Sequence, residues 1–410
     1  MGLSEALGRI AVRHAHVLVA EVPGHWLTRA AVERHVLARG WRLALSPADA
    51  DILAVCGPPC PHLSEPLHRL WEQLPGPRAR IQLESPQAVL PALLAAEQDL
   101  LDLTRQRADS RDRSPDHAAP GQAQPGERHP HEGHAPHEAH GHDHSHERPH
   151  CGAEHADHGG GDGGHAGHGG MGHAGMAHGG MDMAPGGIPL AGGGEDRDGL
   201  EMDLLHLRLG PVLAYWPAGL VLRCTLQGDA IVDAETSLVG VDDPAAPAQA
   251  RPASEDPRRF AARRCDNAAS LLGLAGWDHA ASRARRIRDA LLFTEDRDGP
   301  ARELHRLRRM VGRSRSLRWS LRRVGPLDVQ QTADRDLPDA MTGDVRDRLL
   351  AMLDRAAGGI AGQRPTGPSS GVPVDAIPDL VRGWDLATAR LIVASLDLDP
   401  LVVDREVTHA

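Results

Sequence analysis

Short apolar runs alternate with segments of helical periodicity over residues 11–104. Four such runs, each bounded by polar or turn residues, predict buried strands: residues 16–20, 41–45, 51–55 and 80–83. Between and after them, apolar side chains three to four positions apart predict helices: residues 28–39, 63–74 and 86–103. Thr28 is the expected N-cap of the first helix, and Gly40 is its expected end. Strands that alternate with helices in this way indicate an α/β domain with a small, doubly wound parallel sheet.

Residues 188–410 have a different pattern, which predicts an α+β domain that is mostly helical. Residues 204–209 and 220–226 predict a pair of strands, with a turn at Gln227-Gly228-Asp229 leading into a further strand over residues 231–234. Four longer segments predict helices: residues 267–293, 303–324, 344–356 and 377–390. In the second of these helices, the leucines form an apolar stripe and most arginines lie elsewhere.

Residues 105–187 separate the two predicted domains and differ from both in composition. His, Gly, Pro, Ala and acidic residues dominate this segment, and branched aliphatic residues are almost absent. Such a chain buries too little apolar surface to offset an ordering entropy of ~1–2 kcal/mol per residue. We therefore expect a disordered linker between the two domains.

Histidines are concentrated in this predicted linker, which holds sixteen of the 26 in the chain. Alternating imidazoles on an extended chain can bind a borderline metal ion such as nickel or zinc, and a nearby thiolate can add to the ligand set. The candidate metal ligands are His140, His142, His144, His146, His150, Cys151, His155 and His158. The alternative is that the affinity is incidental and the segment is a soluble spacer. A catalytic site is not expected there, because flexible ligands do not hold a fixed geometry.

Charge is unevenly distributed along the chain. The formal net charge is −11, yet residues 281–325 contain fourteen Arg against five acidic residues. This excess predicts a docking surface for an acidic partner, with Arg308, Arg309 and Arg313 as the candidate docking residues. The alternative is a solvated helix face. Nucleic acid is not expected as a partner, because no recognition motif or aromatic interleaving accompanies the arginines.

Composition also excludes several classes of function. The chain contains no Lys, so neither a P-loop lysine nor a Schiff-base lysine is available. No apolar run approaches the ~20 residues of a membrane span, and the N-terminus has no secretory pattern, so we expect a cytoplasmic protein. The five Cys show no disulfide framework. Cys56 and Cys60 indicate one buried and one half-exposed thiol in a strand-to-helix turn, or else a metal or redox pair.

Several segments of the C-terminal domain resemble a known family. Residues 203–211, 216–220 and 226–229 are similar to the opening β-structure of the quinone-site large subunit of respiratory complex I, which is homologous to nickel–iron hydrogenase large subunits. Residues 267–273 and 391–398 resemble its core helix and its closing segment. The N-terminal domain more weakly resembles the cluster-bearing small subunit of complex I, chiefly through Ala50 to Pro58 and Leu67 to Pro75.

The residues that serve these families in catalysis differ in this chain. The small-subunit family holds a 4Fe–4S cluster with four thiolates, two of them adjacent, whereas this chain has no adjacent cysteines and has Ser85 near the last position. Ala218 stands where complex I has a quinone-binding His, and Tyr215 is the only Tyr. Asp397 lies where hydrogenases have a C-x₂-C motif. We therefore assign no catalytic or cofactor-binding residue.

The resemblance implies an oxidoreductase-family scaffold that has lost its redox ligands. On this interpretation the chain is a structural or accessory component of a membrane-bound redox complex, either NADH:quinone oxidoreductase or a nickel–iron hydrogenase. Its partners would be other subunits of that complex, which would hold it on the inner face of the membrane. One alternative is a nickel- or zinc-handling chaperone or store that serves a hydrogenase. Another is a still-active quinone or electron-transfer subunit with replaced ligands.

Overall fold

The computed structural model describes residues 12–113, 192–195, 201–239, 256–296, 298–363 and 372–399. By their contacts, the described residues up to 113 and those from 192 onward belong to one compact unit. We call residues 12–113 the N-terminal region and the described residues from 192 to 399 the C-terminal region. Within the described ranges, no helix combines the length and the apolar character needed to cross a membrane.

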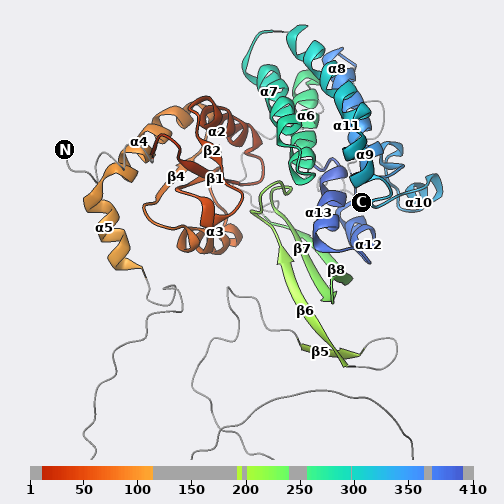
Figure 1. The fold of residues 1–410 in the computed structure, drawn as a ribbon, viewed down its shortest axis with the longest axis horizontal. Coiled ribbons are helices and arrows are strands. Elements are labelled where there is room, and N and C mark those ends of the chain that lie inside the picture. The colour runs from red at the N-terminus through yellow and green to blue at the C-terminus, as the bar shows by residue number, and fades with distance from the viewer. Residues whose placement is uncertain are drawn as a thin grey trace, which may run out of the picture. The chain divides into compact units, whose positions relative to one another are not determined.

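The N-terminal region contains the predicted parallel sheet, with strand order β2-β1-β3-β4 (Figure 1). Its strands are β1 (His16–Glu21), β2 (Arg42–Leu43), β3 (Ile52–Cys56) and β4 (Ala79–Leu83). Its helices are α2 (Trp26–Ala38), α3 (Pro61–Gln73), α4 (Val89–Leu101) and α5 (Leu103–Asp112). All of β3 is buried, as expected for a central strand with helices on both faces.

Alternation along the strands divides the apolar side chains between two cores. Val17 and Ile52 belong to one cluster together with Leu93 of α4, whereas Leu18 and Leu53 belong to a second cluster together with Leu63 of α3. Successive strand residues point to opposite faces of a sheet, so α4 and α3 cover different faces. The doubly wound arrangement predicted from the sequence is confirmed for this region.

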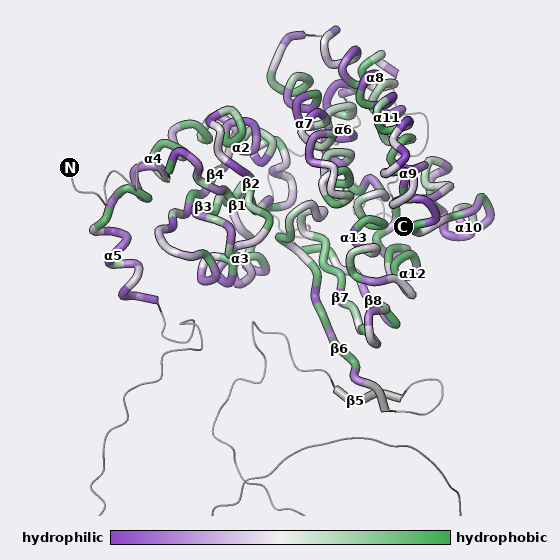
Figure 2. The backbone as a smooth tube through the Cα atoms, in the orientation of Figure 1, coloured by the Kyte–Doolittle hydropathy of each residue, from purple (hydrophilic) through white to green (hydrophobic). Residues whose placement is uncertain are grey.

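Two details of the N-terminal region differ from the sequence prediction. Helix α2 begins at Trp26, and Thr28 is a buried residue inside it, so the predicted cap at Thr28 is wrong. Helix α5 continues past residue 104, where the linker was predicted to begin, and Asp102 caps its first turn. Although α5 is mainly hydrophilic (Figure 2), Asp109 ties it back to the sheet region through an ion pair of 2.9 Å with Arg78.

The C-terminal region opens with an antiparallel sheet of strand order β5-β6-β7-β8. Its strands are β5 (Gly192–Glu195), β6 (Glu201–Leu209), β7 (Leu220–Gln227) and β8 (Ala230–Leu238). The predicted pairing of residues 204–209 with 220–226 is confirmed, and Gly228 turns the chain into β8 with a φ of +59°. The loop between β6 and β7 is fixed by Trp216, whose indole donates to the carbonyl of Leu220 at 2.8 Å.

Helices make up the rest of the C-terminal region. They are α6 (Pro257–Leu274), α7 (Asp278–Phe293), α8 (Asp298–Arg313), α9 (Arg315–Leu321), α10 (Val329–Asp334), α11 (Val345–Ile360), α12 (Ile377–Val381) and α13 (Leu386–Ser395). Three segments predicted as single helices, residues 267–293, 303–324 and 377–390, are each divided, the last of them into α12 and α13. Gly276, with a φ of +73°, separates α6 from α7, and Ser314 starts α9 by accepting a hydrogen bond from the Leu317 amide at 3.2 Å.

Candidate functional site

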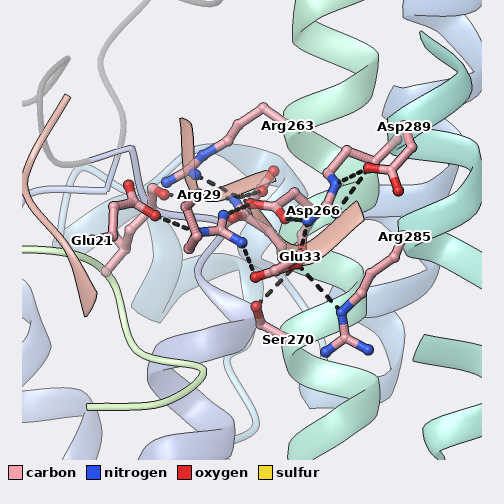
Figure 3. A network of polar contacts seen from close by, with 12 residues as sticks. Glu21, Arg29, Glu33, Arg263, Asp266, Ser270, Arg285 and Asp289 are labelled. Carbon is pink, nitrogen blue, oxygen red and sulfur yellow. Dashed lines mark hydrogen bonds and ion pairs between the residues drawn. The ribbon is translucent and has the colours of Figure 1, made fainter. Parts of the chain in front are cut away.

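The most extensive polar site in the described residues is an ion network that joins the N-terminal and C-terminal regions. Figure 3 shows Arg29 and Glu33 of α2 converging on Asp266 of α6. Arg29 pairs with Glu33 at 2.6 Å and also with Glu21 and Asp266. Because Arg29 and Asp266 come from different regions, this network holds the two regions together.

Helix α7 contributes the second buried guanidinium of this network. Arg288 is completely buried, and its Nη1 donates to Glu33 and to Asp266, each at 2.7 Å. Its Nη2 lies 2.8 Å from Asp289. One guanidinium therefore contacts three carboxylates, one from the N-terminal region and two from the C-terminal region.

The network is balanced in charge. Its arginines are Arg29, Arg263, Arg285 and Arg288, and its carboxylates are Glu21, Glu33, Asp266 and Asp289. Four positive and four negative groups neutralise one another, which is the usual condition for burying charge. Breaking a buried pair by removing one partner typically costs about 3–5 kcal/mol. The network is therefore a strong structural link between the regions.

The neighbouring arginines keep two of the network carboxylates, Glu33 and Asp266, ionised, whereas burial raises the pKa of a third, Asp289. Burial alone would raise the pKa of Glu33, but Arg29, Arg288 and Arg285 outweigh it and lower that pKa to about 2. Burial likewise acts against ionisation of Asp266, and the neighbouring Arg29, Arg288 and Arg263 hold its pKa well below the ordinary value. Carboxylates whose pKa values lie so low do not exchange protons near neutral pH, so they are poor general acids or bases.

A second buried carboxylate ties the end of the described chain to the helices. Asp397 forms ion pairs of 2.7 Å with Arg264 and 2.8 Å with Arg355, and it accepts a hydrogen bond from the Asn267 amide at 2.6 Å. Two guanidinium groups thus pair with this buried carboxylate.

A cavity of about 100 Å³ borders the ion network. Val17 and Val19 of β1 line one part, the loop of residues 211–218 lines another, and Asn267 and Ser270 of α6 complete it. Ala218, which the sequence comparison set at the position of a quinone-binding His, and Tyr215, the only Tyr of the chain, both line this cavity. The guanidinium of Arg285 lies 5.6 Å from the Tyr215 ring centroid, within the range of a cation–π contact.

The described cysteines are buried, free thiols that belong to different cores. Cys56 and Cys60 lie in separate apolar clusters of the N-terminal region, whereas Cys224 and Cys265 lie in the core of the C-terminal region. Burial raises the pKa of Cys265 to about 12 and that of Cys224 to about 11, and it also raises the pKa of Cys56. These groups stay protonated near neutral pH, so they are weak metal ligands and nucleophiles. The interpretation of one half-exposed thiol at Cys56 and Cys60 is wrong, because both are buried.

The predicted metal ligands, from His140 to His158, lie outside the described residues. The nickel or zinc site therefore stays a prediction. Within the described ranges, no three His, Cys, Asp or Glu side chains are grouped so that they could hold a metal ion.

The predicted docking arginines lie on α8, but they are not equivalent. Arg308 forms a bidentate pair with Asp354, at 2.8 and 3.0 Å. Arg309 and Arg313 are exposed and have no ion-pair partner in the part of the chain that the structure describes. Two of the three predicted residues are thus available for contact with a partner.

Sequence reasoning missed an exposed aromatic residue on the next helix, α9. Trp319 of α9 is 86% exposed, and Arg315, Arg318 and Arg322 around it are exposed as well. Helical periodicity could have predicted this exposure, because Leu317 and Leu321 form the buried face of α9 and residue 319 lies on the opposite face. We call Arg309, Arg313, Arg315, Arg318, Trp319 and Arg322 the arginine face.

No family model matches the chain, and a search of curated proteins finds no match.

Proposed function

We propose that this chain is a non-catalytic, subunit-like component of a membrane-bound redox complex of the complex I or hydrogenase type. The observation that carries the proposal is the buried ion network. Where two regions that resemble redox subunits meet, arginines and carboxylates are paired with one another, and the nearby thiols are protonated. Paired charges of this kind stabilise an assembly and do not relay protons. Protonated thiols do not bind clusters.

The arginine face supplies a surface for docking to such a complex. Exposed guanidinium groups steer an acidic partner, and a central tryptophan is the residue type most often found as an energetic anchor in protein interfaces. Trp319, Arg315 and Arg318 combine both features on α9, and Arg309 and Arg313 lie on the preceding helix, α8. We expect the partner to be an acidic surface of another subunit.

Charge reversal on the arginine face tests this function. A tagged full-length chain is purified from gently solubilised membranes, and quinone reduction by the co-purified material is measured. We expect activity to be recovered with the unmodified chain and lost with Arg309→Glu/Arg313→Glu. The matched control is Arg42→Glu/Arg80→Glu, which reverses two exposed arginines of the N-terminal region and should retain recovery. Equal recovery with both double variants would contradict the docking proposal.

The sixteen histidines of the predicted linker favour metal handling as a second candidate function. A variant that lacks residues 129–178 distinguishes the two candidate functions. If the chain is a metal chaperone, cells with this deletion should lose hydrogenase activity and regain it with added nickel. If it is a structural subunit, the deletion should leave recovery of the redox complex unchanged.

A further inference from the structure

A second cavity, of about 150 Å³, lies within the C-terminal region and away from the ion network. Gly325 and Leu327 line it from the segment that follows α9, and Arg335 lines it from just after α10. Arg348 of α11 and Ile392 of α13 contribute further walls. The cavity is therefore built from segments that are well separated in the sequence.

Arg348 is a fully buried cation without a carboxylate partner. Its exposure is 0%, and no Asp or Glu among the described residues lies within ion-pair distance of it. Its guanidinium donates instead to neutral oxygens: Ser395 Oγ at 2.8 Å, Gly343 O at 2.9 Å, Gly325 O at 2.9 Å and Met341 O at 3.3 Å. These four bonds use four of the five N–H groups of an arginine and leave one on Nη2.

The electrostatic surroundings do not neutralise this charge. Arg348 lies in the first turn of α11, where the helix dipole presents its positive end. Burial lowers the pKa of Arg348 to about 10, and the more distant Asp344 and Asp347 only partly oppose this effect. Both of those carboxylates also form the capping box of α11. A guanidinium that is buried near a helix N-terminus and only partly compensated by carboxylates favours the binding of an anion beside it.

A second guanidinium lines the same cavity. Arg335 donates through Nη1 to the carbonyl of Gln331 at 3.2 Å, and its buried Nε has no hydrogen-bond partner among the described residues. One carboxylate, Asp379, also lines the cavity, and it pairs with Arg382 at 2.9 Å. Two cations against one already paired carboxylate give the cavity a positive balance.

We propose that this cavity binds a small oxyanion of the size of phosphate or sulfate. Guanidinium groups bind tetrahedral oxyanions through paired N–H donors, and Arg335 and Arg348 each retain a donor that no atom of the described residues uses. Sites for larger organic ligands usually occupy ~300–1,000 Å³, so this cavity is suited to a free ion. The proposal does not depend on the proposed function of the chain.

Titration calorimetry with inorganic phosphate tests this site. The full-length chain is used well above the histidine pKa, so that imidazolium groups do not bind the anion, and sodium chloride of equal ionic strength is the reference. We expect one saturable site for phosphate and none for chloride. Absence of saturable phosphate binding would overturn the proposal.

Three variants locate the site. Arg335→Gln should weaken phosphate binding about tenfold, because it removes a charge-assisted donor while Arg348 and its packing remain. Asp379→Asn should strengthen binding several-fold, because it removes the one negative charge that lines the cavity. Arg322→Gln, an exposed arginine outside the cavity, should leave binding unchanged. If Arg322→Gln weakens binding as much as Arg335→Gln, the anion binds to the surface and the inference is wrong.

Discussion

Arg288 and Arg348 are both fully buried arginines of the C-terminal region, yet their surroundings differ in kind. Arg288 lies among Glu33, Asp266 and Asp289 in a network whose charges cancel. Among the described residues, Arg348 contacts one hydroxyl and three carbonyl oxygens and no carboxylate. The comparison indicates that burial of an arginine does not by itself identify a functional site. A cation whose charge is matched within the protein stabilises the fold, whereas one left unmatched beside a cavity can bind an anion.

We expect the largest loss of stability from replacement of Arg288, the arginine whose charge is balanced by carboxylates. Arg288→Met leaves Glu33 and Asp266 buried without one of their partners, so we expect the free energy of unfolding to fall by about 3–5 kcal/mol. Arg286→Met, two positions earlier on the exposed face of α7, is the matched control and should change stability by less than about 0.5 kcal/mol. Urea unfolding followed by circular dichroism measures both. Equal destabilisation of the two variants would show that the network does not stabilise the fold.

Acid should weaken the same network. The pKa of Glu33 is about 2 in the folded protein and 4.5 as the ordinary value. A lowered pKa contributes stability that is fully present above 4.5 and is lost as the pH falls towards 2, on the order of 3 kcal/mol. Unfolding free energies measured across this range should therefore decrease steeply. Glu33→Gln should be less stable at neutral pH and should show a shallower decrease. If the two curves are parallel, Glu33 is not held ionised by its arginines.

Removal of the unmatched arginine should have a smaller effect. Arg348→Met leaves neutral acceptors without a donor but also removes an uncompensated charge, so we expect a loss of about 1–3 kcal/mol in the free energy of unfolding. The same experiment with saturating phosphate sharpens the comparison, because a ligand that binds the folded state stabilises it. Phosphate should stabilise the unmodified chain and not Arg348→Met. If Arg348→Met lowers the free energy of unfolding more than Arg288→Met does, the unmatched arginine stabilises the fold more than the matched one, and the comparison is wrong.

The sequence predicted the parallel sheet well but not the network that links it to the helices. Strands β1 and β3 are short apolar runs, and such runs are recognisable without tertiary information. Arg29 and Glu33, by contrast, have the spacing of an ordinary exposed helical pair. Their burial depends on Asp266, which lies 237 positions from Arg29. No local pattern encodes a contact over that separation.

The burial of Arg348 beside the second cavity could partly have been predicted from the sequence. Val345, Leu349 and Met352 form the buried face of α11, and Arg348 is four positions before Met352, on that same face. A charged residue on an apolar helix face is a signal of burial that could have been noticed. The neutral oxygens around it come from three other segments, and the sequence gives no indication that they meet there.

We expect the smallest change in the free energy of unfolding from the exposed arginines of α8. Their charges are solvated, unlike those of Arg288, which is paired with carboxylates, and Arg348, which is buried without one among the described residues. Arg309→Glu/Arg313→Glu should change the free energy of unfolding by less than about 0.5 kcal/mol, because neither side chain has an ion-pair partner among the described residues. Arg308→Glu removes the exposed pair with Asp354 and should cost slightly more, about 0.2–1 kcal/mol. Urea unfolding distinguishes the two.

This last measurement also decides how a loss of partner binding is interpreted. If the double variant keeps its stability and no longer recovers the redox complex, the arginines act at the interface, since the fold they sit on is intact. If the double variant loses as much stability as Arg288→Met, then Arg309 and Arg313 contact other parts of the chain. Lost recovery would in that case reflect unfolding, and the arginine face would no longer be supported as a docking surface.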